Sequence, residues 1–227
     1  MDVRQTISLC SPVMNRLDDL RQCMPARIAE ANASPPVELC ILDCSSTDGL
    51  LDYINELDNP LITYRYLPGI KYWHMAKGKN VATLMGSGDY VVTMGADDAP
   101  QPGFIDAIRL AIDIGYRWGY VDKLCSCIYY PKSEFIGVRG YDERFEFYGP
   151  EDRDMQRRMR MMLGPECVLP NNLLKNIYTP DTKKVANYRI KGTKHSFSRM
   201  MRKYYLENVV NNILVANAGE DWGTWTH

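Results

Sequence analysis

Two pairs of adjacent carboxylates stand out in the sequence, Asp97–Asp98 and Glu151–Asp152. The first pair follows the apolar run DYVVTMG, which has the composition of a buried strand. Two like charges at a strand end are costly unless a metal ion, an Arg or Lys side chain, or water compensates them. The second pair follows Pro150 and opens a predicted helix, where the helix dipole favours ionised carboxylates. Such groups can hold a divalent cation or take a proton from a hydroxyl group.

Alternating strand and helix patterns in the first hundred residues predict how the first pair is positioned. Strands are expected at 6–12, 37–43, 61–67 and 89–95. Helices are expected at 17–31, 47–57 and 75–86, with Thr47 as a helix N-cap. This alternation predicts an α/β fold with a mostly parallel central sheet flanked by helices. Ligands of such sheets bind outside the carboxyl ends of the strands, where Asp43 and Asp97 fall.

The second half of the chain has a less regular pattern. We expect a helix at 104–114, short strands around 117–122 and 125–130, a loop at 137–149, and helices at 151–162 and 195–216.

The segment that contains the first acidic pair, ADDAP (96–100), also suits a solvated turn in which Asp98 caps the following helix. The residues themselves leave both readings of the acidic pair open.

Composition places the chain among globular proteins with one sizeable core. It has 227 residues, 45% of them hydrophobic, and a net charge of −1. No stretch suits a signal peptide or a transmembrane segment, and seven cysteines without a CxxC pair argue against a disulfide framework or structural zinc. We therefore expect a soluble protein of a reducing compartment, the cytoplasm, or the host cytoplasm if the protein is viral.

Charge is unevenly distributed along the chain. Residues 151–205 hold 13 Lys or Arg against 5 Asp or Glu, whereas residues 1–150 hold 14 against 20. Within the first of these segments, residues 182–205 carry eight basic and four aromatic side chains and no acidic one. Four interpretations stay open for this segment: a lid over a diphosphate, a surface for a polyanion such as DNA, a membrane-surface helix, or a solvated face.

Three stretches resemble segments of known glycosyltransferases. ELCILDCSSTDGLLDYI (38–54) and AKGKNVATLMGSGDYVVTMGADDAPQPGFI (76–105) resemble family 2 glycosyltransferases of the GT-A fold. FIGVRGYDERFEFYGPEDRDMQRRM (135–159) is similar to the C-terminal region of galactosyltransferases, including β-1,4-galactosyltransferases. Their order along the chain matches the order in those enzymes.

The resemblance implies an inverting, metal-dependent glycosyltransferase that uses a nucleotide-diphosphate sugar, most simply a UDP-sugar, with Mn²⁺ or Mg²⁺. It implies that Asp152 is the general base, that Glu151 orients hydroxyl groups, and that Asp97 contacts the metal. The Asp-x-Asp triplet of the family falls on Gly95-Ala96-Asp97, so the first carboxylate is absent. Residues 1–180 are expected to form the catalytic domain, with a donor half (1–100) and an acceptor half (101–180), and residues 181–227 a basic lid or helical extension.

Further site residues follow from the resemblance alone. Contacts to the base, the ribose or the diphosphate are expected from Pro12, Asn15, Arg16, Asp43, Lys77, Lys79, Asn80, Ala96 and Asp98. The metal shell is expected to include Asp97 and Asp98, completed by Asp181 or His195.

The acceptor and two other functions stay open at this stage. The acceptor is expected to be a saccharide or glycan, or a hydroxylated base in DNA, as in DNA modification by phage enzymes. A nucleotidyltransferase is one alternative, although SPVMNRLDD (11–19) lacks the Gly-rich loop that such an enzyme needs. A catalytically inactive nucleotide-sugar-binding or interaction protein is the other, since the triplet lacks one carboxylate.

Overall fold

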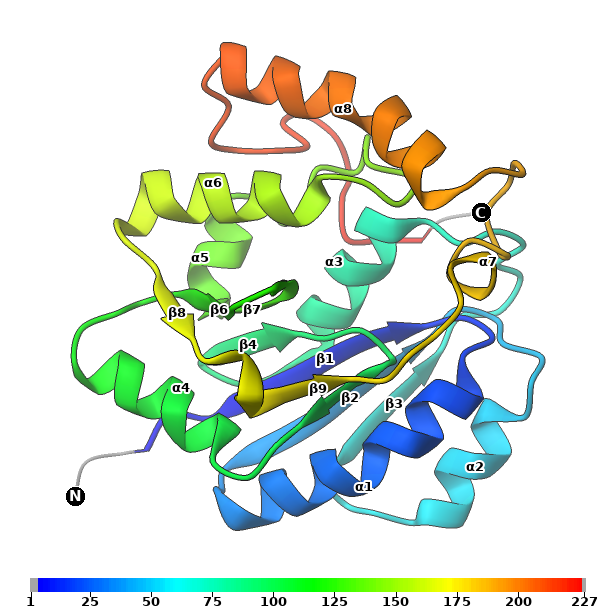
Figure 1. Ribbon diagram of the computed structural model, residues 1–227, viewed down its shortest axis with the longest axis vertical. Helices are drawn as coiled ribbons and strands as arrows, with labels where there is room; N and C mark the ends of the chain where they lie inside the picture. The colour runs from blue at the N-terminus through cyan, green and yellow to red at the C-terminus, as the bar shows by residue number, and fades with distance from the viewer. Residues whose placement is uncertain (1–3, 226–227) are drawn as a thin grey trace.

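A seven-stranded sheet forms the centre of the molecule in the computed structural model, which describes residues 4–225 (Figure 1). The strand order is β3-β2-β1-β4-β7-β6-β8. The strands are β1 (Ile7–Val13), β2 (Val37–Asp43), β3 (Ile62–Tyr66), β4 (Tyr90–Thr93), β6 (Gly119–Val121), β7 (Leu124–Pro131) and β8 (Cys167–Leu169). Only β7 runs antiparallel to its neighbours, β4 and β6, so the expectation of a mostly parallel sheet is confirmed.

Helices cover both faces of this sheet (Figure 1). One face is covered by α1 (Leu17–Ala33), α2 (Leu50–Leu57) and α4 (Phe104–Asp113). The other is covered by α3 (Met75–Met85), α5 (Lys132–Gly137), α6 (Glu151–Leu163) and α8 (Lys194–Val210), with α8 lying above α6. The sheet is therefore buried on both sides, as its nearly continuous apolar strands predict.

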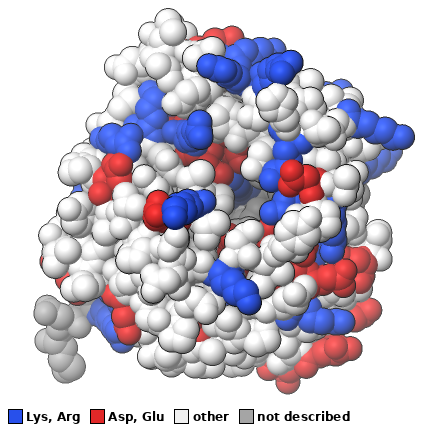
Figure 2. Space-filling view, viewed as in Figure 1, with Lys and Arg blue, Asp and Glu red and all other residues white. Residues whose placement is uncertain are grey.

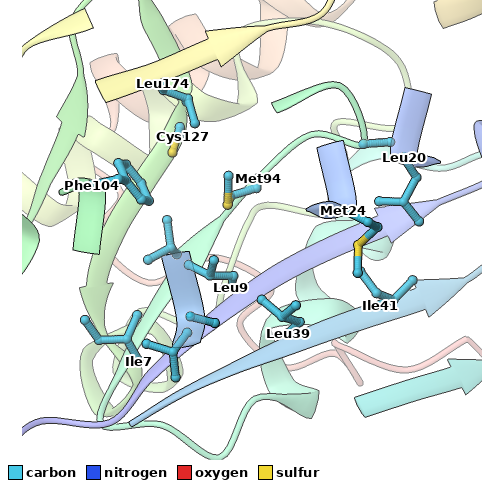
Figure 3. Close-up of a cluster of buried hydrophobic side chains, with 14 of the residues drawn as sticks. Ile7, Leu9, Leu20, Met24, Leu39, Ile41, Met94, Phe104, Cys127 and Leu174 are labelled. Carbon is cyan, nitrogen blue, oxygen red and sulfur yellow. The ribbon is translucent and has the colours of Figure 1, made fainter. Parts of the chain in front are cut away.

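The two apolar cores are built from alternate residues of the same strands. In β2, Leu39 and Ile41 point into the core beneath α1, while Cys40 and Leu42 point to the core beneath α3. Figure 3 shows the first core, where Leu39 and Ile41 lie with Leu9 of β1 and Met24 of α1. Because side chains alternate along a strand, one strand fills both layers and holds its carboxyl end rigidly.

A small second sheet returns the chain to the carboxyl ends of the central strands. Its strands are β5 (Asp98–Pro100) and β9 (Leu174–Asn176), which pair antiparallel with Asp98 opposite Asn176. A short helix η1 (Asn171–Leu173) precedes β9, and α7 (Asp181–Lys184) follows it. The backbone N–H of Ile177 donates to the carbonyl of Asp97 at 2.7 Å, so the following basic segment lies against the first acidic pair.

Two local expectations were wrong, and one alternative that the sequence left open does not hold. The N-cap of α2 is Gly49, in a left-handed conformation with φ +88°, and not Thr47. The N-cap of α4 is Gly103, so Asp98 does not cap that helix. The last long helix ends at Val210, six residues earlier than expected, where the backbone turns back across the molecule. No helix within residues 4–225 has both the length and the apolar character needed to span a bilayer.

Candidate active site

A cavity of about 510 Å³ lies where the carboxyl ends of the strands meet the start of α6. Both Asp97 and Asp152 line it, although 55 positions separate them in the sequence. The charged side chains of its lining are Arg16, Lys79, Lys123, Arg153, Lys183, Lys184 and Lys194 on the basic side, and Asp97, Asp98, Glu151 and Asp152 on the acidic side. Figure 2 shows a hollow near the middle of this face, bordered by both blue and red side chains. The volume is typical of small-molecule sites.

A buried arginine holds the turn that carries the first acidic pair. Arg27 of α1 is 1% exposed, and its guanidinium donates to the carbonyl of Gly95 at 2.6 Å and to the carbonyl of Asp98 at 2.9 and 3.1 Å. It also donates to Ser11 of β1 at 2.8 Å. The compensating charge beneath this turn therefore comes from a side chain 70 residues earlier in the sequence, and it fixes the backbone on which Asp97 sits.

Both carboxylate oxygens of Asp98 accept hydrogen bonds that hold the turn in place. Its Oδ2 accepts the backbone N–H of Gly95 at 2.7 Å, and its Oδ1 accepts from Asn176 of β9 at 2.8 Å. Burial, followed by the nearby charge of Asp97, raises the pKa of Asp98. A Cβ at position 95 would lie 2.7 Å from Asp97 Oδ1 and 3.2 Å from Asp98 Oδ2, so this turn packs two carboxylates over a glycine. A larger residue at the position of the first family carboxylate would therefore make the Asp97 side chain shift.

Asp97, by contrast, faces the cavity and is surrounded by cations. Its Oδ2 lies 2.6 Å from Lys184 Nζ and 3.4 Å from the guanidinium of Arg16. The Lys184 contact is an ion pair without hydrogen-bond geometry, since Asp97 Oδ2 has no hydrogen-bond partner among the described residues. Burial alone would raise the pKa of Asp97, but Lys184 and Arg16 together lower it. The carboxylate is therefore ionised, and its Oδ2 is covered by Lys184 and Arg16.

The second acidic pair shares one ammonium group. Lys79 Nζ of α3 lies 2.6 Å from Asp152 Oδ1 and 3.0 Å from Glu151 Oε1. Glu151 Oε2 accepts the backbone N–H of Gly149 at 3.1 Å, so both oxygens of Glu151 are occupied. No described residue donates to Asp152 Oδ2, and Asp152 is 9% exposed against 2% for Glu151. Asp152 is the member of the pair that can reach a ligand.

The pKa shifts of this triad follow from burial and charge. Burial is the largest cause that raises the pKa of Glu151, to about 7, and the charge of Asp152 adds to it. Burial would lower the pKa of Lys79, but the charges of Asp152 and Glu151 outweigh it and raise that pKa. Lys79 therefore stays protonated, and Glu151 titrates near neutral pH.

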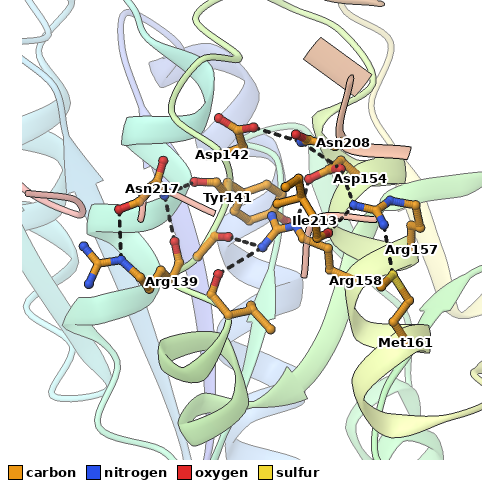
Figure 4. Close-up of polar contacts among 12 residues, drawn as sticks. Arg139, Tyr141, Asp142, Asp154, Arg157, Arg158, Met161, Asn208, Ile213 and Asn217 are labelled. Carbon is orange, nitrogen blue, oxygen red and sulfur yellow. Dashed lines mark hydrogen bonds and ion pairs between the residues drawn. The ribbon is translucent and has the colours of Figure 1, made fainter. Parts of the chain in front are cut away.

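A buried polar network fixes α6, and with it Asp152, to α8 (Figure 4). Asn208 of α8 donates to Asp142 at 2.9 Å and to Asp154 of α6 at 3.1 Å. Arg158, on the next turn of α6, pairs with Asp154 at 2.8 Å and donates to the carbonyl of Gly140 at 2.7 Å. Charged partners inside a protein fix orientation strongly because leaving either one unpaired is costly. Asp154 is thus structural.

Two family models match successive parts of this chain. The model of glycosyl transferase family 2 matches residues 8–117, which contain β1 to β4 and the turn with Asp97. The model described as the N-terminal domain of galactosyltransferase matches residues 111–180, which contain Glu151 and Asp152. The chain is a family 2-like glycosyltransferase. A search of curated proteins found no sequence match.

Solved structures show that the glycosyltransferase has the GT-A fold. TarS of S. aureus in complex with UDP-GlcNAc has 14% identity and a TM-score of 0.71, over 90% of this chain and 66% of that chain. The complex of TarS with UDP has 12% identity and a TM-score of 0.66, over 90% and 72%. The mannosyltransferase PcManGT of Pyrobaculum calidifontis, in complex with GDP-Man and Mn²⁺, has 14% identity and a TM-score of 0.65, over 94% and 73%. The chain spans 43% of another TarS crystal structure.

The structure gathers about half of the expected site residues of the glycosyltransferase around the cavity. Those that line it are Pro12, Arg16, Lys79, Ala96, Asp97, Asp98, Glu151 and Asp152. Lys79 is paired with Glu151 and Asp152 of α6, so its ammonium group is not free to contact a diphosphate. Asn80 is buried and donates to the carbonyl of Tyr141, which makes it a structural residue. Lys77 lies 4.0 Å from Glu143, outside the lining.

Two residues expected near the base stand beside the cavity and outside its lining. Asp43 ends β2, and its oxygens accept from Ser46 N–H and Tyr64 O–H, each at 2.7 Å. Asn15 has a left-handed backbone with φ +53° and accepts from the N–H of Thr47 at 2.8 Å. Both side chains therefore shape the loops after β1 and β2.

The four expected metal ligands do not gather in one place. Asp181 is exposed and pairs with Lys194 at 3.0 Å, and His195 is exposed and lies 3.1 Å from Arg199. Among residues 4–225, no group of three or more His, Cys, Asp or Glu side chains is arranged to hold a metal ion. Asp98 has both oxygens engaged, which leaves Asp97 as the one of the four that offers an oxygen to the cavity. A single carboxylate fits Mg²⁺ or Mn²⁺ bound mainly through substrate phosphates and water.

Several functional candidates were missed in the sequence. Lys184 and Arg27 contact the Asp97 turn from opposite sides, and Asn187 donates to the carbonyl of Met14 at 3.0 Å while lining the cavity. The basic composition of 182–205 pointed to this segment but not to Lys184 in particular. Lys184 lies 87 positions after Asp97 in the sequence. The pairing of β5 with β9 brings the segment that contains Lys184 back beside Asp97.

Proposed function

We propose that this glycosyltransferase moves a sugar from a nucleotide-diphosphate donor, a UDP-sugar, to a hydroxyl group of its acceptor with inversion at the anomeric carbon. One observation carries the proposal: Asp97 and Asp152 line a single cavity whose remaining charged side chains are mostly cationic. The first carboxylate suits the cation-bridged diphosphate, and the second suits the acceptor hydroxyl. TarS, which binds UDP and UDP-GlcNAc according to its structures, supports the choice of uridine.

Asp152 is the general base of the proposed reaction. Its unoccupied Oδ2 takes the proton of the acceptor hydroxyl while that oxygen forms the bond to the anomeric carbon. The bond from the anomeric carbon to the diphosphate breaks on the opposite side, and the diphosphate leaves with the electron pair. Lys79 holds the other oxygen of Asp152 and so fixes the direction of the free one. A single displacement of this kind inverts the configuration.

Asp97 is the residue that would hold a divalent cation, Mn²⁺ or Mg²⁺, together with the donor. When bound, such an ion neutralises negative charge on the leaving diphosphate. PcManGT, whose structure contains GDP-Man and Mn²⁺, supports this part of the proposal. Arg16 is fixed by Asp19 and by Thr179 at 3.3 Å, so it supplies a fixed positive charge beside Asp97.

The acceptor is a saccharide hydroxyl or a hydroxylated base in DNA. Exposed cations lie just before α8 and along it, at Lys191, Arg199, Arg202 and Lys203. A nucleic-acid acceptor would use them as phosphate contacts and would need its target base flipped out of the helix. A salt titration of DNA binding distinguishes the two classes, because phosphate contacts lose affinity steeply with salt.

The donor assignment is tested by thermal shift and by product analysis. UDP and UDP-sugars should raise the melting temperature in the presence of Mn²⁺, and GDP should raise it less. Incubation with the UDP-sugar that binds and with a panel of saccharides and hydroxymethylated DNA should release UDP, and NMR of the product should show the inverted anomer. Failure of every nucleotide and nucleotide sugar to bind with any divalent ion would refute the donor assignment, and a retained anomer would refute the role of Asp152.

A further inference from the structure

The segment that borders the cavity after β9 is held by ion pairs and by Tyr188, which is buried against Phe147 and Phe197. We refer to residues 177–194 as the strap. Lys183 pairs with Asp18 at 3.2 Å, and Arg189 pairs with Glu146 at 3.1 Å. Five basic residues and one acidic residue lie in the strap. Ion pairs at a partly exposed surface contribute little each, so such contacts can be exchanged at low cost.

One of these ion pairs lies inside the cavity. Lys184, whose side chain is 20% exposed, places its ammonium 2.6 Å from Asp97 Oδ2. This oxygen is buried beneath Lys184 and Arg16, so a divalent ion could reach it only if the ammonium group of Lys184 moved away. An ion at ~2.0–2.2 Å from that oxygen and an ammonium in contact with it would lie within roughly 4 Å of each other, where like charges repel strongly. Lys184 and a metal ion therefore cannot both contact this oxygen of Asp97.

We propose that Lys184 is an exchangeable counter-ion: it neutralises Asp97 in the donor-free protein and moves to the diphosphate when the donor and its cation bind. This inference rests on the proposed function, because it assumes a diphosphate donor. It assigns to Lys184 a binding role toward the donor, in which the ammonium group moves and the backbone of the strap stays in place.

The geometry of the strap permits this exchange. Lys184 ends the four-residue helix α7, and its flexible four-carbon side chain can turn without moving the backbone. The backbone on each side is fixed, by Thr179 donating to Asp19 at 2.8 Å and by the carbonyl of Asn187 accepting from Trp73 N–H at 2.8 Å. Lys194 lies at the same cavity, 4.7 Å from the ring centre of Tyr148, and closes its other side.

If Lys184 exchanges in this way, removing its ammonium group should have opposite effects on the affinities for Mn²⁺ and for UDP. Removing the ammonium frees Asp97 for Mn²⁺ in the absence of donor, so the affinity for Mn²⁺ alone should rise. Removing it also deletes one partner of the diphosphate, so the affinity for UDP in saturating Mn²⁺ should fall. A lysine that only stabilises the fold would not change the two affinities in opposite directions.

The test is calorimetric titration of Lys184→Met with Mn²⁺ alone and with UDP in saturating Mn²⁺, beside the wild-type protein. We expect about fivefold tighter Mn²⁺ binding and about tenfold weaker UDP binding, the second from the loss of one charge-assisted contact. Lys184→Arg should keep UDP affinity within about threefold. Arg189→Gln removes a cation of the same strap outside the cavity and is the matched control, with both affinities unchanged.

Two outcomes separate the inference from the proposed function. If wild-type protein binds UDP and Lys184→Met binds Mn²⁺ and UDP as the wild type does, the exchange is refuted and the donor assignment stands. If no nucleoside diphosphate binds the wild type, the proposed function fails; tighter binding of Mn²⁺ alone to Lys184→Met would then still support Lys184 as the counter-ion of Asp97, and unchanged binding would refute it. Thermal unfolding of each variant shows whether it is folded, and Lys184→Ala serves as a second variant.

Discussion

The ammonium of Lys79 lies 2.6 Å from Asp152 Oδ1, and it connects α3, which packs against β1 and β2, to the first turn of α6. It reaches Glu151 at 3.0 Å as well, so one cation serves two carboxylates. Because Glu151 is engaged on both oxygens, this arrangement leaves Asp152 with the only oxygen of the triad that no described residue contacts. Two adjacent carboxylates thus have different surroundings in the folded protein.

Asp152→Asn should abolish turnover and leave donor binding intact. The substitution keeps the shape and the contact with Lys79 through its amide oxygen but removes the basic carboxylate, which contributes ~10²–10⁴-fold to the rate. Turnover of a UDP-sugar and calorimetric binding of UDP should be measured on the same preparation. Near-normal turnover would contradict the assignment of Asp152 as the base, and loss of UDP binding would show a role on the donor side.

Lys79→Met should destabilise the protein strongly. It leaves two buried carboxylates without a cation, which typically costs ~3–5 kcal/mol in the free energy of unfolding. The double variant Lys79→Met/Glu151→Gln should lose less, because only one buried charge is then unpaired. Urea unfolding of both variants and of the wild type measures the difference, and equal losses in the single and double variants would contradict the shared ammonium.

Glu151→Gln should change how stability depends on pH. The pKa of Glu151 in the folded protein is raised to about 7 from an ordinary 4.5, so the folded state retains this proton at higher pH than the unfolded state does. The stability that follows from this proton is fully present below the ordinary value and is lost as pH rises through about 7. Gln at position 151 cannot ionise, so the variant does not lose this stability as pH rises.

Relative to the wild type, Glu151→Gln should therefore gain stability between pH 5 and pH 8, by up to roughly 3 kcal/mol at about 1.4 kcal/mol for each pKa unit. Thermal unfolding at several pH values measures this difference. Parallel curves for the two proteins would show that Glu151 does not carry the raised pKa.

Asp97→Asn and Asp98→Asn should have different effects although the residues are adjacent. Asp97 faces the cavity, so its amide variant should weaken Mn²⁺-dependent UDP binding about tenfold or more, with little change in folding. Asp98 accepts from Gly95 N–H and from Asn176, so its amide variant places a donor against a donor and should cost ~1–3 kcal/mol of stability. UDP titration and urea unfolding on both variants make each the control of the other. If Asp98→Asn weakened UDP binding and Asp97→Asn lowered stability instead, the roles assigned to the two residues would be reversed.

Local patterns in the sequence were enough to predict the main elements of the fold. Apolar runs of strand length, separated by helical spacing, gave β2 at its observed bounds and β1, β3, β4, α1, α3, α4 and α6 within a few residues. They succeed because burial on both faces of a parallel sheet requires continuous apolar strands. The same patterns missed β5 and β9, since a three-residue strand has no periodicity to detect.

The sequence by itself determined which carboxylates are candidates: a strand end for Asp97 and a helix start for Asp152 are local properties, written in the residues on either side. Only the tertiary structure decided what each carboxylate does. Asp98 is held by Asn176, Asp97 faces Lys184, and Glu151 shares Lys79 with Asp152, and every one of these partners lies more than 70 positions away. Charge pairing acts across a few ångströms of space and not along the chain, so the role of a carboxylate depends on which distant cation the fold brings beside it.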